Sequence, residues 1–136
     1  MRDGNPEILG TSPIPDPDAV LSLIDDSIIV DSSVVCGRAH ALISYARSLR
    51  NIERGTSVGS SQATEFFRQV TGERQVSRAI KKARIKAGQG AVLITYGNPD
   101  EILLSLGLER DDGVLECEGK NCEEECLERS ALVEIL

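Results

Sequence analysis

Cys36 and His40, four residues apart, have the residue types of a thiol–imidazole catalytic pair. His40 is the only histidine in the chain, so a Ser–His–Asp mechanism would also have to use it. The Gly-x-Ser-x-Gly turn that carries the serine of many hydrolases does not occur in this sequence. A histidine at the start of a helix usually caps or packs. We therefore predict a protein that is not an enzyme, with a small Cys/His enzyme kept as an alternative.

The remaining cysteines, Cys117, Cys122 and Cys126, have the wrong spacing for an ordinary zinc site. Such sites favour Cys-x-x-Cys pairs and four ligands. We expect reduced thiols and no bound metal or cofactor. Gly88-Gln-Gly90 likewise lacks the lysine and the strand–loop–helix order of a phosphate-binding loop.

A basic helix after Gly72 is the best candidate for a binding surface. At 100° per residue, its arginines and lysines lie opposite the apolar positions, where they suit contacts with phosphate groups. The alternative is an ordinary solvated helix face. The candidate nucleic-acid contacts are Arg74, Gln75, Arg78, Lys81 and Lys82, with His40 and Arg47 of an earlier helix added for the same surface.

The charge of −7 is unevenly distributed along the chain. Residues 38–86 contain eleven lysines and arginines but only three acidic residues, whereas the segments before and after them are strongly acidic. This asymmetry indicates one surface that attracts an anion. The only aromatic residues are Tyr45, Phe66, Phe67 and Tyr96, too few for a platform that stacks single-stranded bases.

The length of 136 residues favours a single domain, residues 1–136, with an aliphatic core. No apolar run approaches the roughly 20 residues needed to cross a bilayer, and no signal-peptide stretch follows the N-terminus. We expect a cytoplasmic protein that has no contact with a membrane.

Hydrophobic periodicity and capping signals predict alternating strands and helices. The expected class is α/β, or α+β in layers, with a small mixed or antiparallel sheet packed with several helices. The strand order is not readable. The expected strands are 7–11, 28–30, 91–96 and 114–117, and the expected helices are 17–24, 38–51, 61–71, 74–83, 98–107 and one that begins near Asn121.

The apolar stripes of these helices predict which faces pack into the core. In the helix 38–51 we expect His40, Ser44 and Arg47 to lie on an outer face. The positions expected to face inward are Ala39, Leu42, Ile43, Ala46 and Leu49. The later helices repeat the pattern. Their expected core positions are Ala63, Phe66, Phe67, Val70, Val76, Ala79, Ile80 and Ala83.

Several segments together resemble the PRPK-binding protein family, the kinase-binding small subunit of the KEOPS tRNA-modification complex, in its archaeal form. The most specific is Gly72-Glu-Arg-Gln-Val-Ser-Arg-Ala-Ile80, which is similar to the family's Gly-x-Arg-Gln-Ile-x-x-Ala-Ile signature. Val34-Val-Cys-Gly-Arg-Ala-His40, the helix end at residues 65–72 and the strand at residues 91–97 with its Asn-Pro-Asp-Glu start also fit. The resemblance covers about residues 7–116, and the Cys- and Glu-rich helix and tail at 117–136 depart from it.

The resemblance implies a subunit that is not itself an enzyme. It implies binding to the small atypical kinase/ATPase of the complex and to tRNA, notably the single-stranded CCA end. Such a subunit supports threonylcarbamoylation of the adenosine beside the anticodon, which another subunit performs. A purely structural protein–protein adaptor without nucleic-acid contact remains open as a second alternative.

Overall fold

The computed structural model describes residues 6–24, 27–55 and 61–115. The chain divides into two compact units. The described part of the first, the sheet unit, consists of residues 6–24, 27–33 and 85–115. The described part of the second, the helical unit, consists of residues 34–55 and 61–84. No described helix is long and apolar enough to span a membrane.

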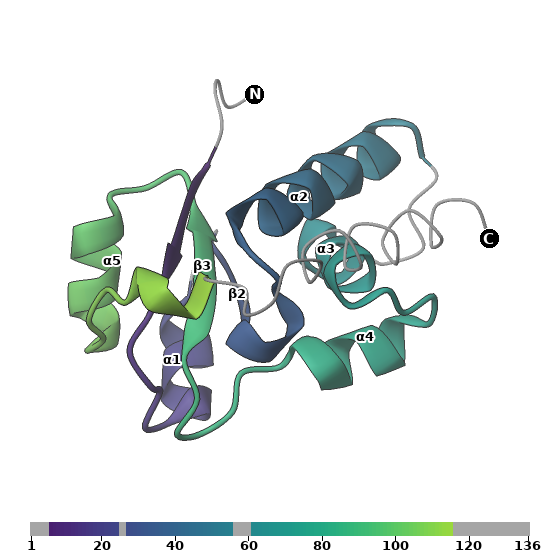
Figure 1. Cartoon of the computed structure of the whole chain (residues 1–136). Helices are drawn as coiled ribbons and strands as arrows, with labels where there is room; N and C mark the ends of the chain where they lie inside the picture. The colour runs from purple at the N-terminus through teal and green to yellow at the C-terminus, as the bar shows by residue number, and fades with distance from the viewer. Residues whose placement is uncertain (1–5, 25–26, 56–60, 116–136) are drawn as a thin grey trace. The chain divides into compact units, whose positions relative to one another are not determined.

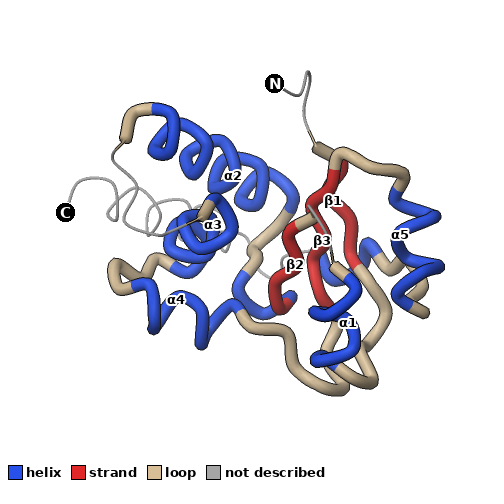
Figure 2. Tube along the Cα trace, turned by 180° about the vertical axis from the view of Figure 1, so that it is seen from behind, coloured by secondary structure: helices blue, strands red, loops and turns tan. Residues whose placement is uncertain are grey.

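The sheet unit contains a three-stranded antiparallel sheet in the order β1-β3-β2. Its strands are β1 (Glu7–Gly10), β2 (Ile28–Asp31) and β3 (Ala91–Thr95). Figure 2 shows β3 between the other two strands, although it comes last in the chain. In the register, Leu93 pairs with Leu9 on one side and Ile29 on the other. The prediction of an α+β fold with a small sheet is confirmed, and the sheet is antiparallel.

Two capped helices cover one face of this sheet, α1 (Pro17–Leu23) and α5 (Pro99–Leu106). Each has a proline in its first turn, and the preceding residues Asp16 and Asn98 accept hydrogen bonds from first-turn amides. Their apolar sides meet the strands in an aliphatic core. This core contains Leu9, Ile14, Val20, Ile29, Ile85, Ala91, Leu93, Leu103, Leu106 and Leu108.

The helical unit consists of α2 (Arg38–Glu53), α3 (Gln62–Thr71) and α4 (Val76–Ala83). A capping box between Ser61 and Thr64 starts α3, and the left-handed residue Gly72 (φ 74°) ends it. In Figure 1, α3 lies between α2 and α4, and it contacts both of them. Phe66 is fully buried, and its ring meets that of Tyr45 edge-on with 6.4 Å between the centroids.

The face that α2 turns inward is the opposite of the one predicted. Ala39 and Ala46 are exposed, and Leu42, Ile43 and Leu49 are only partly buried. Small side chains allow close helix packing. Among the polar ones, Ser48 donates to the Tyr45 carbonyl within α2 and Asn51 donates to Glu65 of α3. The buried residues of the helix are His40, Ala41, Ser44, Tyr45, Ser48 and Asn51.

The strand predicted at residues 114–117 is also wrong in its described part, residues 114–115. Residues Asp112–Leu115 form a 3-10 turn that packs against β1. The Asp111 amide donates to the Gly10 carbonyl at 2.9 Å, and a Cβ at Gly10 would lie 2.1 Å from the Asp111 oxygen. Only glycine permits this approach, so the chain turns here instead of adding a strand. The helix predicted near Asn121 lies outside the described residues.

Cys36 is disulfide-bonded in this structure, which contradicts the expectation of four reduced thiols. The partner of Cys36 lies outside the described residues. Cysteine bonded in this way offers no thiolate, so the Cys36–His40 pair has no nucleophile in this state.

Candidate nucleic-acid interface

The turn between α3 and α4 brings the predicted basic residues to one place. Gly72 reverses the chain direction, and the Thr71 hydroxyl links the two sides of the turn. Its Oγ1 donates to the Phe67 carbonyl at 2.6 Å and accepts from the Glu73 amide at 3.2 Å. The residues that follow, Arg74 and Gln75, are exposed at the start of α4.

A buried ion pair on α3 supports this turn. Nη1 of Arg68 donates to both carboxylate oxygens of Glu65, at 2.8 and 3.1 Å. Asn51 of α2 donates to the same carboxylate at 3.1 Å. Nε of Arg68 donates to the backbone carbonyl of Arg74 at 2.7 Å. A series of hydrogen bonds therefore connects α2 through α3 to the turn, and Arg68 makes the bond to the turn itself.

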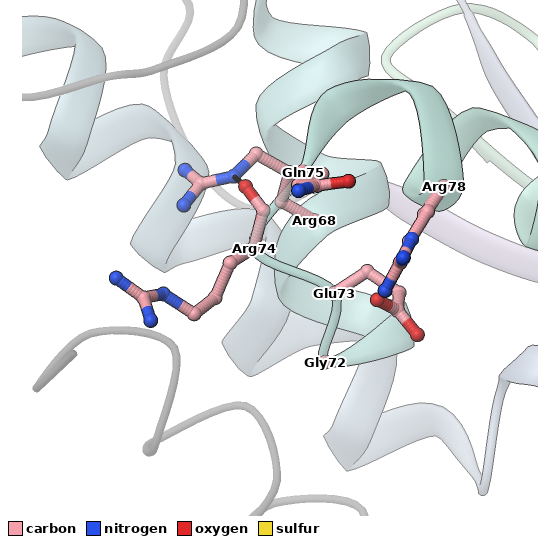
Figure 3. Close-up of a pocket in the computed structure, with 6 residues that line it drawn as sticks. All are labelled: Arg68, Gly72, Glu73, Arg74, Gln75 and Arg78. Carbon is pink, nitrogen blue, oxygen red and sulfur yellow. Dashed lines mark hydrogen bonds between the residues drawn. The ribbon is translucent and has the colours of Figure 1, made fainter.

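An open pocket of about 600 Å³ lies at this turn, and Figure 3 shows its lining. The Arg68 and Arg74 guanidinium groups extend to the same side, and the Arg78 side chain lies beside the Glu73 carboxylate. The side chain of Gln75 makes no capping hydrogen bond to α4. The lining residues are Arg68, Gly72, Glu73, Arg74, Gln75 and Arg78.

The basic face of α4 continues from this pocket. Ala79 and Ala83 are fully buried, which leaves Arg78, Lys81 and Lys82 exposed, as predicted. Ile80 departs from the predicted apolar stripe because 39% of its surface is exposed. The short helix buries only alanines, so its longer side chains remain outside.

Glu73 is an acidic residue within this basic surface, and its role was not predicted. Its carboxylate forms an ion pair with Lys82. The hydrogen bond from Lys82 lowers the pKa of Glu73, and the charges of Lys82 and Arg78 add to this effect. A phosphate group at this surface would therefore compete with Glu73 for both cations. Lys82 is committed to Glu73 when no ligand is bound.

The structure separates His40 and Arg47 from the exposed candidates. His40 has no exposed surface, and its Nδ1 accepts a hydrogen bond from the Cys36 amide at 3.0 Å. Arg47 is partly buried, and its Nη1 is inaccessible to solvent. Because the predicted face assignment of α2 was inverted, residues expected outside lie inside. The fully buried His40 cannot reach a phosphate in this conformation. Arg47 is only partly buried, but it is not among the described residues that line the pocket at the turn, so we leave both residues out of the interface.

Sequence reasoning overlooked the buried residues that hold the turn, Asn51, Glu65 and Arg68. The spacing of Glu65 and Arg68, three residues apart on one helix, is a usable signal for an ion pair. Nothing in the local sequence indicates that the pair is buried or that Arg68 contacts the Arg74 carbonyl. That contact depends on the path of the chain after Gly72.

Other chemistry finds little support in the described residues. No three histidine, cysteine or acidic side chains group there in a way that could hold a metal ion. Cys117, Cys122 and Cys126 lie outside the described residues. The comparisons with protein-family models and with curated proteins find no match for this chain.

Proposed function

We propose that this protein is a non-catalytic RNA-binding subunit that binds tRNA through the turn and α4. The surface formed by Arg74, Gln75, Arg78, Lys81 and Lys82 is called the basic surface from here on. The observation that carries the proposal is the exposure of these five side chains beside an open pocket. Phosphate contacts from such side chains supply most of the affinity of proteins for nucleic acids.

The charge of the two units supports the same reading. In its described residues, the helical unit has ten lysines and arginines and three acidic residues. The protein as a whole has a net charge of −7, so unspecific attraction to RNA is poor. Binding should therefore depend on the local basic surface and weaken steeply with added salt.

The resemblance of residues 72–80 to the KEOPS kinase-binding subunit makes the proposal more specific. We infer that the RNA is tRNA, that its CCA end enters the contact, and that binding supports threonylcarbamoyladenosine formation by a partner subunit. The pocket offers arginines and an amide, and no aromatic ring lines it. This composition suits contacts to phosphates and base edges more than stacking.

The test is the affinity for tRNA at two salt concentrations, for the wild type and for Arg74→Glu with Arg78→Glu. We expect the double variant to bind at least about tenfold more weakly, with a salt slope lower by about one to two. The matched control is Arg50→Glu with Arg54→Glu, the same charge change at the exposed end of α2. Circular dichroism checks the fold of both variants.

Equal affinities and slopes for the wild type and both variants would mean that the basic surface is only solvated. The purely structural adaptor would then be the better reading. A tRNA that lacks the CCA end tests the finer part of the proposal. The wild type should bind this truncated tRNA more weakly than full-length tRNA. The Arg74→Glu, Arg78→Glu variant should bind the two tRNAs with equal affinity.

The second proposed partner is the small atypical kinase/ATPase of the complex, which rests on the resemblance alone. We expect a complex that survives gel filtration at micromolar concentration with the cognate kinase. The Arg74→Glu, Arg78→Glu variant should still form it, which would separate the two binding activities. Failure of the wild type to co-elute with the kinase would contradict this part.

The proposal places the protein in the cytoplasm, where thiols are kept reduced. The disulfide of Cys36 makes this testable. Protein isolated from its own cells, with thiols blocked at lysis, reports the state of Cys36 there, and a reduced Cys36 would support the cytoplasmic part of the proposal. Complete oxidation of Cys36 at the moment of lysis would instead indicate an oxidising compartment or an unusually stable disulfide.

A further inference from the structure

Arg68 forms hydrogen bonds both to the interior of the helical unit and to the backbone of the basic surface. The residue is 7% exposed and Glu65 is fully buried, so this is an interior ion pair. One nitrogen of the Arg68 guanidinium holds the Glu65 carboxylate, and a second, Nε, holds the Arg74 carbonyl at 2.7 Å. The side chain therefore connects the interior of α3 to the backbone of a candidate phosphate contact.

The direction of the Arg68 side chain is set from both ends. Asn51 and Arg68 both donate to Oε1 of Glu65, so the carboxylate is held by α2 as well as by α3. Arginine has a planar fork with donors in fixed directions, whereas lysine is a point charge on a flexible stem. A lysine at position 68 could keep the charge beside Glu65 but could not also reach the Arg74 carbonyl with the same geometry.

Stability alone does not account for this arrangement. A buried ion pair is often no better for stability than apolar residues of similar volume. What the pair adds is a fixed backbone position at residue 74, two residues after the left-handed Gly72 and before the first turn of α4. The Thr71 hydroxyl holds the first half of this turn, and Arg68 adds a bond to its second half, at the residue that carries the exposed Arg74 side chain.

We propose that Arg68 is a positioning residue for RNA binding. It holds the Gly72–Gln75 turn so that the Arg74 side chain meets a phosphate group in a prepared orientation. The inference rests on the proposed RNA-binding function and adds a residue that does not have to touch the RNA. Preorganisation of this kind raises affinity because less motion is lost on binding.

The test is a double-mutant cycle on tRNA affinity, with Arg68→Lys, Arg74→Ala and the two combined. Arg68→Lys keeps the charge next to Glu65, so the fold should survive, as circular dichroism can verify. We expect each single change to weaken binding about threefold to tenfold, and Arg74→Ala to cost less than about twofold once Arg68 is lysine. The matched cycle pairs Arg68→Lys with Lys81→Ala, an exposed position farther along α4, and should be additive.

A second measurement follows the turn without RNA. Amide hydrogen exchange of the segment 72–76 should accelerate in Arg68→Lys, while the segment 42–50 of α2 keeps the exchange rate of the wild type. Unchanged exchange at 72–76 would show that Arg68 does not hold the turn, and this result would overturn the inference whatever the RNA data.

The outcomes separate the inference from the proposed function. Wild-type binding that is weakened by Arg74→Glu with Arg78→Glu, together with an additive Arg68–Arg74 cycle, overturns the positioning role alone. Equal tRNA binding by the wild type and the charge-reversed variant overturns the proposed function, and the RNA role of Arg68 with it. Coupling in the first cycle together with additivity in the second supports both.

Discussion

The sheet unit and the helical unit differ in both surface charge and core chemistry. Among described residues, the sheet unit has nine acidic residues and two basic ones, whereas the helical unit has three and ten. The sheet unit has an aliphatic core and also buries the polar side chains of Thr11, Asp31 and Thr95, whereas the helical unit buries a larger polar set that includes Asn51, Glu65 and Arg68. The unit that carries the proposed RNA surface therefore has the more polar interior of the two.

This difference suggests that the two units use different kinds of packing for different purposes. Aliphatic packing is non-directional and tolerates exchange of side chains of similar volume. Buried hydrogen bonds and ion pairs are directional, and they are costly when only half satisfied. An interface that must present Arg74 and Arg78 at fixed positions gains from the directional kind. The acidic sheet unit has no such requirement and would repel RNA.

The largest expected effect on stability comes from removing one partner of the buried ion pair in the helical unit. Glu65→Ala leaves the Arg68 guanidinium buried without its carboxylate and should lower the free energy of unfolding by about 3–5 kcal/mol. Glu65→Leu combined with Arg68→Met should recover most of that loss, because no buried charge remains. Urea denaturation measures both variants. A double variant as unstable as Glu65→Ala would contradict the contrast between directional and apolar packing.

The matched change in the sheet unit is Leu93→Ala, which removes apolar volume from the centre of the sheet. It should cost about 2–5 kcal/mol because a cavity remains. No second substitution that neutralises a charge can rescue it. The comparison is sharpened if Leu93→Ala leaves tRNA affinity unchanged at temperatures where the protein is folded.

The disulfide of Cys36, which belongs to the helical unit, should make the next largest contribution to the free energy of unfolding. Cys36→Ser should lower the free energy of unfolding by about 2–4 kcal/mol without reductant. Excess dithiothreitol should lower the free energy of unfolding of the wild type to that of the variant. Thiol titration of the unfolded wild type under non-reducing conditions is the control, and four free thiols would contradict the disulfide.

Gly10→Ala tests the edge of the sheet unit. An added Cβ would collide with the Asp111 carbonyl, so either β1 or the turn after Asp111 must shift. We expect a loss of about 1–3 kcal/mol in the free energy of unfolding. Replacement of Gly88 by alanine is a useful contrast, because nothing lies within 4 Å of a Cβ there and only its positive φ of 80° is strained.

The smallest expected effect concerns Glu73 on the basic surface. Its pKa is lowered in the folded state by Lys82, so the ion pair stabilises above the ordinary pKa of 4.5 and is lost as the pH falls through the folded pKa. Glu73→Gln should therefore cost no more than about 1 kcal/mol at pH 7 and nothing at acid pH. The same change should strengthen tRNA binding about twofold to threefold, since Arg78 and Lys82 lose a competitor. Weaker tRNA binding by Glu73→Gln would show that the carboxylate helps to arrange the cations.

Local chemistry was enough to predict much of the fold. The caps Asp16, Ser61 and Asn98, and the glycines Gly72 and Gly107 that end α3 and α5, act over three or four residues. The exposure of Arg78 and Lys81 also followed from helical periodicity, because the buried alanines of α4 define its inner face, whereas Arg74 lies in the turn before α4 and not in the helix predicted from residue 74. These features depend on interactions within one turn of the chain.

The features that the sequence could not determine depend on residues far apart along it. The order β1-β3-β2 places the last strand in the centre, and no local signal encodes that choice. On the inward face of α2, Asn51 meets its partner Glu65 on α3, a contact between residues that lie fourteen positions apart in the chain. Likewise, Arg68 reaches the Arg74 carbonyl only because the chain reverses at Gly72. Periodicity and capping depend on neighbours in sequence, whereas the choice of a buried polar partner is made by neighbours in space.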